Sequence, residues 1–290
     1  MKPITTILFG CLIFLSSCAT GRINPYLSQS PDTGSALKSD KKTEKLFAKL
    51  WSERHDGASL ARFIEIAKPI TRSPADSRDR WLKLARAEYL LAEFHTEPGP
   101  ERLGLYLSAA NRAEALLHLN PTYGELARRP RYSPEDALPA LDRQDLEAAH
   151  WFAESLYRWS VESGPERELK HRRTVRSFFN QVEAMSPGYR YGAADRHFGI
   201  EFARSRDGDP EALKRSRARF ESLMRNHGGY FGNVVAYARF LARPSGDEAL
   251  FRKLLERVIK ESPSIPAESV SEQILEQKRA KALLTPKKAP

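Results

Sequence analysis

Residues 175–187 read VRSFFNQVEAMSP, and this stretch decides the fold. Its apolar residues Val175, Phe179 and Val182 are separated by steps of four and three, which places them on one face of an α-helix. Pro187 follows five residues later, where a proline ends the helix and lets the chain reverse. The stretch therefore predicts an amphipathic helix with one buried stripe and a turn after it.

The same order of spacings returns three more times. Each copy has steps of four and three between small or apolar residues, followed by a Pro or Gly five residues on. The copies are Ala109, Ala113, Leu116 and Pro121, then Ser216, Phe220, Leu223 and Gly228, then Phe251, Leu255, Val258 and Pro263. This is the spacing of the second helix of a tetratricopeptide repeat. The Pro or Gly residues that end successive copies are 66, 41 and 35 positions apart, so insertions between the copies obscure the repeat period.

Helix start and stop signals divide residues 41–284 into pairs, and no sustained apolar-polar alternation predicts a strand. Pro165 and Pro210 are expected in first turns, where a missing N–H costs no hydrogen bond. Region 122–141 holds three prolines and interrupts the helix pairs, so it is expected to be either a functional loop or a simply irregular connection. We expect helices over 43–54 and 58–68, 76–95 and 100–119, 142–162 and 165–185, 192–205 and 209–226, 233–243 and 246–261, and 267–284.

These patterns predict an all-α fold. Its helix hairpins are expected to stack into a tetratricopeptide-like superhelix, with the last helix as a C-terminal cap and residues 285–290 as a short tail. The composition is globular, with 41% hydrophobic and 29% charged residues, which argues against disorder as the main state. Two cysteines, Cys11 and Cys18, are too few for a disulfide framework or a cysteine-rich metal site.

The N-terminus has the layout of a bacterial export signal. Lys2 precedes an apolar run from Ile4 to Leu15, which is too short to span a bilayer but matches a signal-peptide core. The run ends in Leu15-Ser16-Ser17-Cys18, which resembles a lipobox. We therefore expect removal of residues 1–17 and lipidation of Cys18. The alternative is an ordinary secretory signal that happens to contain a cysteine.

Residues 18–40 are rich in Ser, Pro, Gly and Asn and predict a flexible tether. Ala19 after the cysteine resembles the pattern that sorts Gram-negative lipoproteins to the outer membrane, so we expect the body to face the periplasm. Chromosomal DNA is absent from the periplasm, so we do not expect a nucleic-acid partner despite the net charge of +10. Anionic lipid, cell-wall polymer, an acidic ligand or a merely solvated arginine-rich surface would each account for it.

Several sequence blocks follow in order over roughly residues 80–284. They are Ala113-Glu114-Ala115-Leu116-Leu117, His150-Trp151-Phe152-Ala153-Glu154-Ser155, Tyr191-Gly192-Ala193 through Phe198-Gly199, Tyr237-Ala238-Arg239-Phe240, and Gln277-Lys278-Arg279-Ala280-Lys281-Ala282-Leu283-Leu284. Together with the lipobox and the irregular repeats, they resemble the T-component family of tripartite ATP-independent periplasmic (TRAP) transporters, lipoproteins of the TatT type. No single block is diagnostic; the order carries the resemblance.

The resemblance implies a helical periplasmic lipoprotein that associates with the solute-binding protein of a TRAP transporter. It also implies a homotrimer with a central pore and, as ligands, small organic acids or other hydrophobic anions. The alternative from another class is a structural or assembly scaffold of the cell envelope that uses the same hairpins without a small ligand.

The sequence offers little for catalysis. It contains no Gly-x-Ser-x-Gly, no His-Glu-x-x-His and no glycine-rich phosphate loop, so we expect no catalytic residues, no cofactor and no enzyme activity. The seven histidines include no pair four residues apart, so no metal site is expected. A periplasmic hydrolase would require the fold to bring an acid, a base and a nucleophile into one cleft.

Binding residues are expected among aromatic and basic side chains. Arg196, His197 and Arg239 are candidates for contacting a carboxylate, which a guanidinium matches with two hydrogen bonds. The aromatic candidates for the inner surface of the superhelix are Trp151, Tyr191 and Tyr237. Core packing is the alternative for each aromatic, and a solvated surface is the alternative for each arginine.

Overall fold

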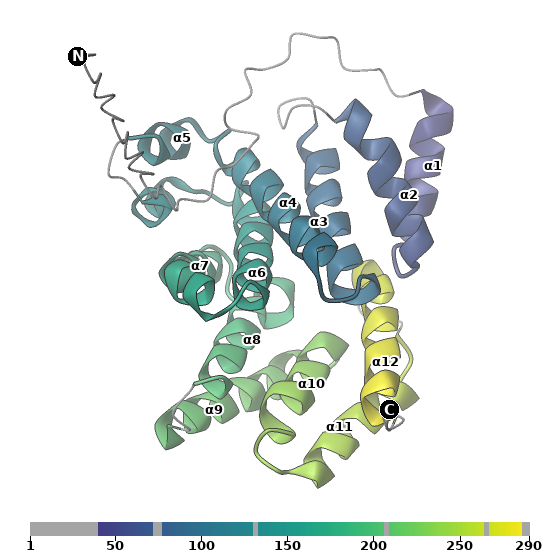
Figure 1. The fold of residues 1–290 in the computed structure, drawn as a ribbon, viewed down its shortest axis with the longest axis vertical. Helices are drawn as coiled ribbons and strands as arrows, with labels where there is room; N and C mark the ends of the chain where they lie inside the picture. Colours follow the sequence, from purple (N-terminus) through teal and green to yellow (C-terminus); the bar gives the residue numbers. More distant parts are fainter. Residues whose placement is uncertain (1–39, 72–76, 130–132, 206–208, 264–266, 286–290) are drawn as a thin grey trace, which may run out of the picture.

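A computed structural model describes residues 40–71, 77–129, 133–205, 209–263 and 267–285 (Figure 1). Within these ranges every regular element is a helix, which confirms the all-α prediction. The superhelical stacking itself stays a prediction. The expected signal peptide, the lipidation of Cys18 and all but the last residue of the expected tether lie outside the described residues.

The predicted helices are present, with ends that differ by a few residues, and α5 is an additional helix that was not predicted. They are α1 (Lys41–Ser52), α2 (Gly57–Ala67), α3 (Arg78–His95), α4 (Pro100–Leu117), α5 (Pro121–Ala127), α6 (Leu146–Glu162), α7 (Pro165–Met185), α8 (Tyr189–Ala203), α9 (Pro210–His227), α10 (Phe231–Tyr237), α11 (Glu248–Lys260) and α12 (Val270–Leu284). Short 3₁₀ turns occur at η1 (Lys68–Ile70), η2 (Pro134–Ala140) and η4 (Ala267–Ser269), and α10 continues as one π-helical turn, η3 (Ala238–Ala242).

Helix starts follow the expected capping chemistry. Pro165 and Pro210 stand at the first residues of α7 and α9, as predicted. Gly164 precedes α7 with φ of 107°, a backbone angle that side chains disfavour. Acidic or amide side chains accept a backbone N–H in the first turn of other helices, namely at Asp40, Asp56, Asn120, Asp209 and Asp247.

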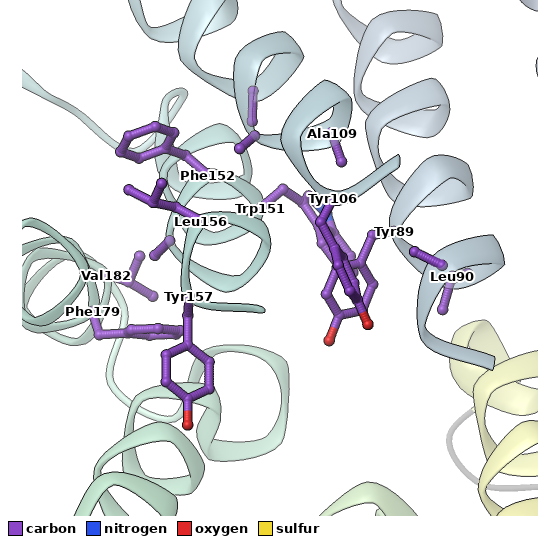
Figure 2. Packing of buried hydrophobic residues seen from close by; sticks show 14 of the residues in the cluster. Tyr89, Leu90, Tyr106, Ala109, Trp151, Phe152, Leu156, Tyr157, Phe179 and Val182 are labelled. Carbon is purple, nitrogen blue, oxygen red and sulfur yellow. The ribbon is translucent and has the colours of Figure 1, made fainter. Parts of the chain in front are cut away.

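The four predicted stripes face the core. Every one of their residues is at most 2% exposed, including Val175, Phe179 and Val182 on α7. Figure 2 shows Phe179 and Val182 beside Leu156 of α6, so the stripe of one helix packs on its neighbour. Burial of such side chains contributes about 1.5–3 kcal/mol each, which makes the spacing a strong determinant of the hairpins.

The expectation of an irregular connection over 122–141 was wrong for the residues that the structure describes there. Helix α5 and the turn η2 occupy most of them, since Pro134 stands in the first turn of η2, where no hydrogen bond is lost, and Pro139 is accommodated within η2. The amide of Asn120 joins the two: its Oδ1 accepts from the N–H of Tyr123, and its Nδ2 donates to the carbonyl of Ala140 at 2.9 Å. Helix α5 and η2 are therefore joined to each other and to the body by a side-chain hydrogen-bond bridge.

The last helix returns to the first hairpin (Figure 1). Glu272 of α12 forms an ion pair with Arg54 at 3.0 Å, between α1 and α2, and a second with Arg86 of α3. Backbone carbonyls add to the contact, since Ser271 donates to Ser52 and Lys278 to His55. These bonds join residues at least 186 positions apart and close the helices into a ring.

We predict that Glu272→Gln lowers the free energy of unfolding by about 3 kcal/mol at pH 7, because two buried arginines lose their counter-charge. Burial opposes ionisation, but Arg86 and Arg54 lower the pKa of Glu272 to about 2. Its charge therefore stabilises the fold above the unfolded pKa of about 4.3, and this contribution is lost as the pH falls toward 2. Urea unfolding at pH 7 and pH 3 measures both effects.

Glu211→Gln is the matched control, because the pair of Glu211 with Lys214 is exposed on α9. We expect it to change stability by less than about 0.5 kcal/mol. Equal losses in the two variants would contradict ring closure through Glu272.

Candidate ligand-binding cleft

A cleft lies at the centre of the ring, between α3, α6, α8, α10 with η3, and α12. Its volume is about 70 Å³, enough for several water-sized groups. The charged side chains that line it come from distant parts of the sequence. The arginines are Arg158, Arg190, Arg196, Arg239 and Arg279, and the glutamates are Glu93, Glu154, Glu272 and Glu276. The lining has five arginines and four glutamates, and Glu272 is also paired with Arg54 and Arg86 outside the lining.

The glutamates are occupied by structural contacts. Glu93 is 5% exposed; it accepts from the hydroxyl of Tyr106 at 2.6 Å and from Arg279 at 2.7 Å. Arg158 lies 3.4 Å from the same carboxylate. Although burial opposes ionisation, Arg158 and Arg279 lower the pKa of Glu93 to about 2, so it stays charged at neutral pH. Two of the five arginines are thus paired with carboxylates, Arg158 with Glu93 and Glu154 and Arg279 with Glu93 and Glu276.

The Tyr89 hydroxyl engages a second acid, donating to Glu154 at 2.8 Å. Figure 2 shows the rings of Tyr89, Tyr106 and Trp151 packed together, with both tyrosine hydroxyls directed to the same side. Tyr89 and Trp151 line the cleft on the side of α3 and α6, and Tyr106 of α4 packs behind them. The hydroxyls of Tyr106 and Tyr89 donate to Glu93 and Glu154, the two acids that pair with Arg158.

Three arginines of the cleft form cation–π contacts with aromatic rings and not ion pairs with carboxylates. The guanidinium of Arg190 lies 4.9 Å from the ring centre of Trp151, and that of Arg239 lies 5.0 Å from Phe240. Arg196 stands over Tyr230 at 5.4 Å and donates to the side-chain oxygen of Asn233 at 2.8 Å. None of the three forms an ion pair with a carboxylate in the described part of the chain.

The positive charge of these arginines shifts the pKa values of neighbouring side chains. Burial and the charge of Arg190 lower the pKa of Arg86 to about 10. Burial, followed by Arg190 and Arg196, lowers the pKa of His150 well below its usual value, so its imidazole is neutral. The cleft therefore repels further cations and attracts anions.

A left-handed turn sets the position of Arg190. Arg190 and Tyr191 have φ of 46° and 60°, and Gly192 follows at 76°, so the right-handed part of α8 begins at Ala193. A non-glycine residue in this region costs about 1–2 kcal/mol. Such strain persists only where neighbouring contacts hold it in place.

Asn233 of α10 provides one of these contacts. Its amide nitrogen donates to the carbonyl of Tyr191 at 2.9 Å and to that of His227 at 3.2 Å, while its oxygen accepts from Arg196. The side chain of Tyr191 adds another, since its hydroxyl bonds Glu268 and its ring stacks on Tyr230. Asn233 is fully buried and fixes both Arg196 and the turn that carries Arg190.

A comparison with protein families places this geometry in context. The family model for the TRAP transporter T-component matches residues 99–289, about two thirds of the chain. The chain belongs to the TRAP transporter T-component family. This confirms the resemblance drawn from the sequence blocks. No curated protein matches the chain.

T-components are parts of a transport system and not a family of enzymes. The matched region begins in α4, so it contains every cleft residue except those of α3. In the described ranges of this T-component, no helix is both long and apolar enough to cross a bilayer. No cluster of His, Cys, Asp or Glu suited to a metal ion occurs in the same ranges.

The structure brings three of the six predicted binding residues together in this T-component. Trp151, Arg196 and Arg239 line the cleft. Tyr191 forms the left-handed turn, and its side chain extends to Glu268 outside the cleft.

The other two predicted residues lie in the core. The ring of His197 stacks on Phe179 at 4.1 Å, and burial lowers its pKa to about 3. Tyr237 stacks on Phe220 at 5.2 Å, between α9 and α10. Neither side chain lines the cleft.

Sequence reasoning missed Arg190, Asn233 and the acids of α3 and α12. The sequence held one indication of an unusual backbone at Arg190. It lies between Tyr189 and Tyr191, with Gly188 and Gly192 two positions away on either side. Asn233 had none, since an asparagine in an apolar helix does not indicate which carbonyl it will meet.

We predict that Asn233→Ala lowers the free energy of unfolding by about 2 kcal/mol, because the fully buried amide loses its hydrogen bonds to the carbonyls of Tyr191 and His227 and to Arg196. Urea unfolding measures the change. Asn180→Ala, on the exposed face of α7, is the control and is expected to change stability by less than about 0.5 kcal/mol. A similar effect of both substitutions would contradict the positioning role of Asn233.

Proposed function

We propose that this T-component is a lipid-anchored periplasmic subunit that associates with the solute-binding protein of its TRAP transporter and holds a small organic acid in the central cleft. The family match carries the transport role. The three arginines without carboxylate partners support the ligand, because they leave an anion-attracting site inside the ring. A small hydrophobic anion fits the same aromatic wall.

The proposed mechanism is display near a membrane. Two or three acyl chains on Cys18 would anchor the chain firmly to the outer membrane, since each buried CH₂ contributes about 0.8 kcal/mol. The expected tether would let the helical body reach a partner in the periplasm. Arg239 is exposed at the edge of the cleft, which supports exchange of a ligand between cleft and surface. A homotrimer with a central pore is part of this proposal.

We predict that Cys18→Ser abolishes lipid attachment and releases the protein from the membrane fraction. The measurement is incorporation of radiolabelled palmitate in cells, followed by fractionation. Cys11→Ser is the matched control, because Cys11 lies inside the segment expected to be removed. Labelling of the Cys18→Ser variant would contradict the anchor.

We predict that the full chain, purified in detergent, captures the solute-binding protein encoded in the same transport operon. Native mass spectrometry of the eluate measures both the association and the oligomeric mass. A trimer carrying the partner is the expected result. A monomer that captures no solute-binding protein would contradict the proposal and favour the envelope scaffold without a small ligand.

A further inference from the structure

We propose that a basic face formed by α7 and α9 rests on the anionic lipid headgroups of the bilayer to which the chain is anchored. This inference rests on the proposed function only for the N-terminal anchor. It adds a second membrane contact on a surface that shares no residue with the central cleft. The basic face is defined by Lys170, Arg172, Arg173 and Arg176 of α7 and by Lys214, Arg215 and Arg217 of α9.

The first argument is the concentration of charge on two helices. Together α7 and α9 contain ten Lys or Arg residues and five Glu residues, so they carry half of the net charge of +10. Figure 1 shows both helices on the side of the body away from α1 and α12. Such a local excess of one sign attracts an anionic surface.

The two helices meet along an open groove of about 740 Å³, and its arginines are loosely held. Arg172 and Arg176 of α7 lie 3.9 and 3.4 Å from the same acid, Glu201 of α8. Arg215 of α9 lies 3.7 Å from Asp209. Each of these arginines is about half exposed, and exposed ion pairs of this length are weak, so the guanidinium groups are free to bind another anion.

Cations outside the groove are more open still. Lys170 and Arg173 are exposed on α7 and form no ion pair in the described part of the chain. Lys214 of α9 is 78% exposed and lies 3.9 Å from Glu211. These side chains therefore point to solvent on both borders of the groove, where a flat anionic surface would meet them.

The second argument is that the first half of α7 stands out from the body. The buried residues of α7 begin at Val175, so residues 165–174 contribute none. Leu169 in this half is 68% exposed, the highest value for a large hydrophobic side chain in the described ranges. Arg172, Arg173 and Arg176 follow it at three, four and seven positions and share its helix face. An apolar side chain among cations is typical of a helix at a bilayer interface.

The third argument distinguishes a bilayer from an acidic protein. Specific protein interfaces have a core of aromatic and other apolar side chains, from which charged residues are depleted. Leu169 is the one exposed large hydrophobic side chain of α7 and α9. Phe202 lines the groove, but the guanidinium of Arg215 stands over its ring at 5.0 Å. A charged face without an apolar core favours mobile lipid headgroups, which rearrange around each cation.

The expected tether is long enough for this orientation. Residues 18–40 span about 75 Å when fully extended. A compact domain of this size has a diameter of roughly 45 Å. The anchor at Cys18 and the basic face would therefore reach the same bilayer, although α1 lies on the other side of the body (Figure 1).

The test measures how far the body stands from a bilayer. The full chain, held by its own N-terminus, is placed on a supported bilayer of phosphatidylcholine alone or mixed with about one third of phosphatidylglycerol, an anionic lipid. Neutron reflectometry gives the thickness of the water layer between headgroups and protein. We expect a gap of about 25 Å on phosphatidylcholine, the reach of the tether, and none on the mixed bilayer at low salt. High salt should restore the gap, because it screens the charges. An equal gap on both bilayers would overturn the inference.

The informative variant combines Arg173→Glu with Lys214→Glu and reverses one exposed charge on each helix. We expect it to stand off the mixed bilayer as the unmodified chain stands off phosphatidylcholine. Arg252→Glu with Lys253→Glu, exposed on α11, is the matched control and is expected to keep the contact. Unfolding temperatures show whether both variants fold. An equal effect of the two double variants on the gap would overturn the inference.

The remaining outcomes separate this inference from the proposed function. A chain that leaves phosphatidylcholine but stays on the mixed bilayer counts against the anchor alone, whereas loss from both bilayers overturns both. Capture of the solute-binding protein is measured on the same preparations. If the Arg173→Glu, Lys214→Glu variant loses capture and the unmodified chain shows equal gaps, the basic face binds an acidic protein and the inference is overturned.

Discussion

Glu272 holds arginines from two elements of the N-terminal half, and this buried contact determines how the rest of the chain is arranged. The helix hairpins are local units, each specified by its own apolar stripe. Nothing in a hairpin dictates where the last helix should lie relative to the first. The ion pairs of Glu272, with those between Arg279 and Glu93, supply that information across most of the chain. The cleft exists because these contacts close the helices around it.

The same contacts explain why the cleft contains arginines that are not paired with glutamates. Buried glutamates need cations to remain ionised, and the ring supplies more arginines than the glutamates consume. The excess arginines rest on aromatic rings, which keep them near the cleft at a smaller desolvation cost than full burial. The acids thus pair with arginines that close the ring, and three further arginines line the cleft without a carboxylate partner in the described part of the chain.

The sequence specifies what short-range physics controls. The spacing around Phe179 predicts a buried stripe, and Pro165 and Pro210 mark helix starts, because both effects operate within one or two turns. Two kinds of feature escape such reasoning. Ion pairs such as Arg54 with Glu272 depend on the whole path of the chain. The left-handed turn at Arg190 runs against local preference and is stabilised by Asn233, more than 40 positions away.

Ring closure by α12 has a consequence for biosynthesis. The ribosome makes the last helix after every other part of the cleft, so an incomplete chain leaves Arg54, Arg86 and Glu93 without their partners on α12. Such a chain has unpaired charges at the junction of its first hairpins. Only a chain translated to its end can therefore form the contacts that close the ring and complete the cleft.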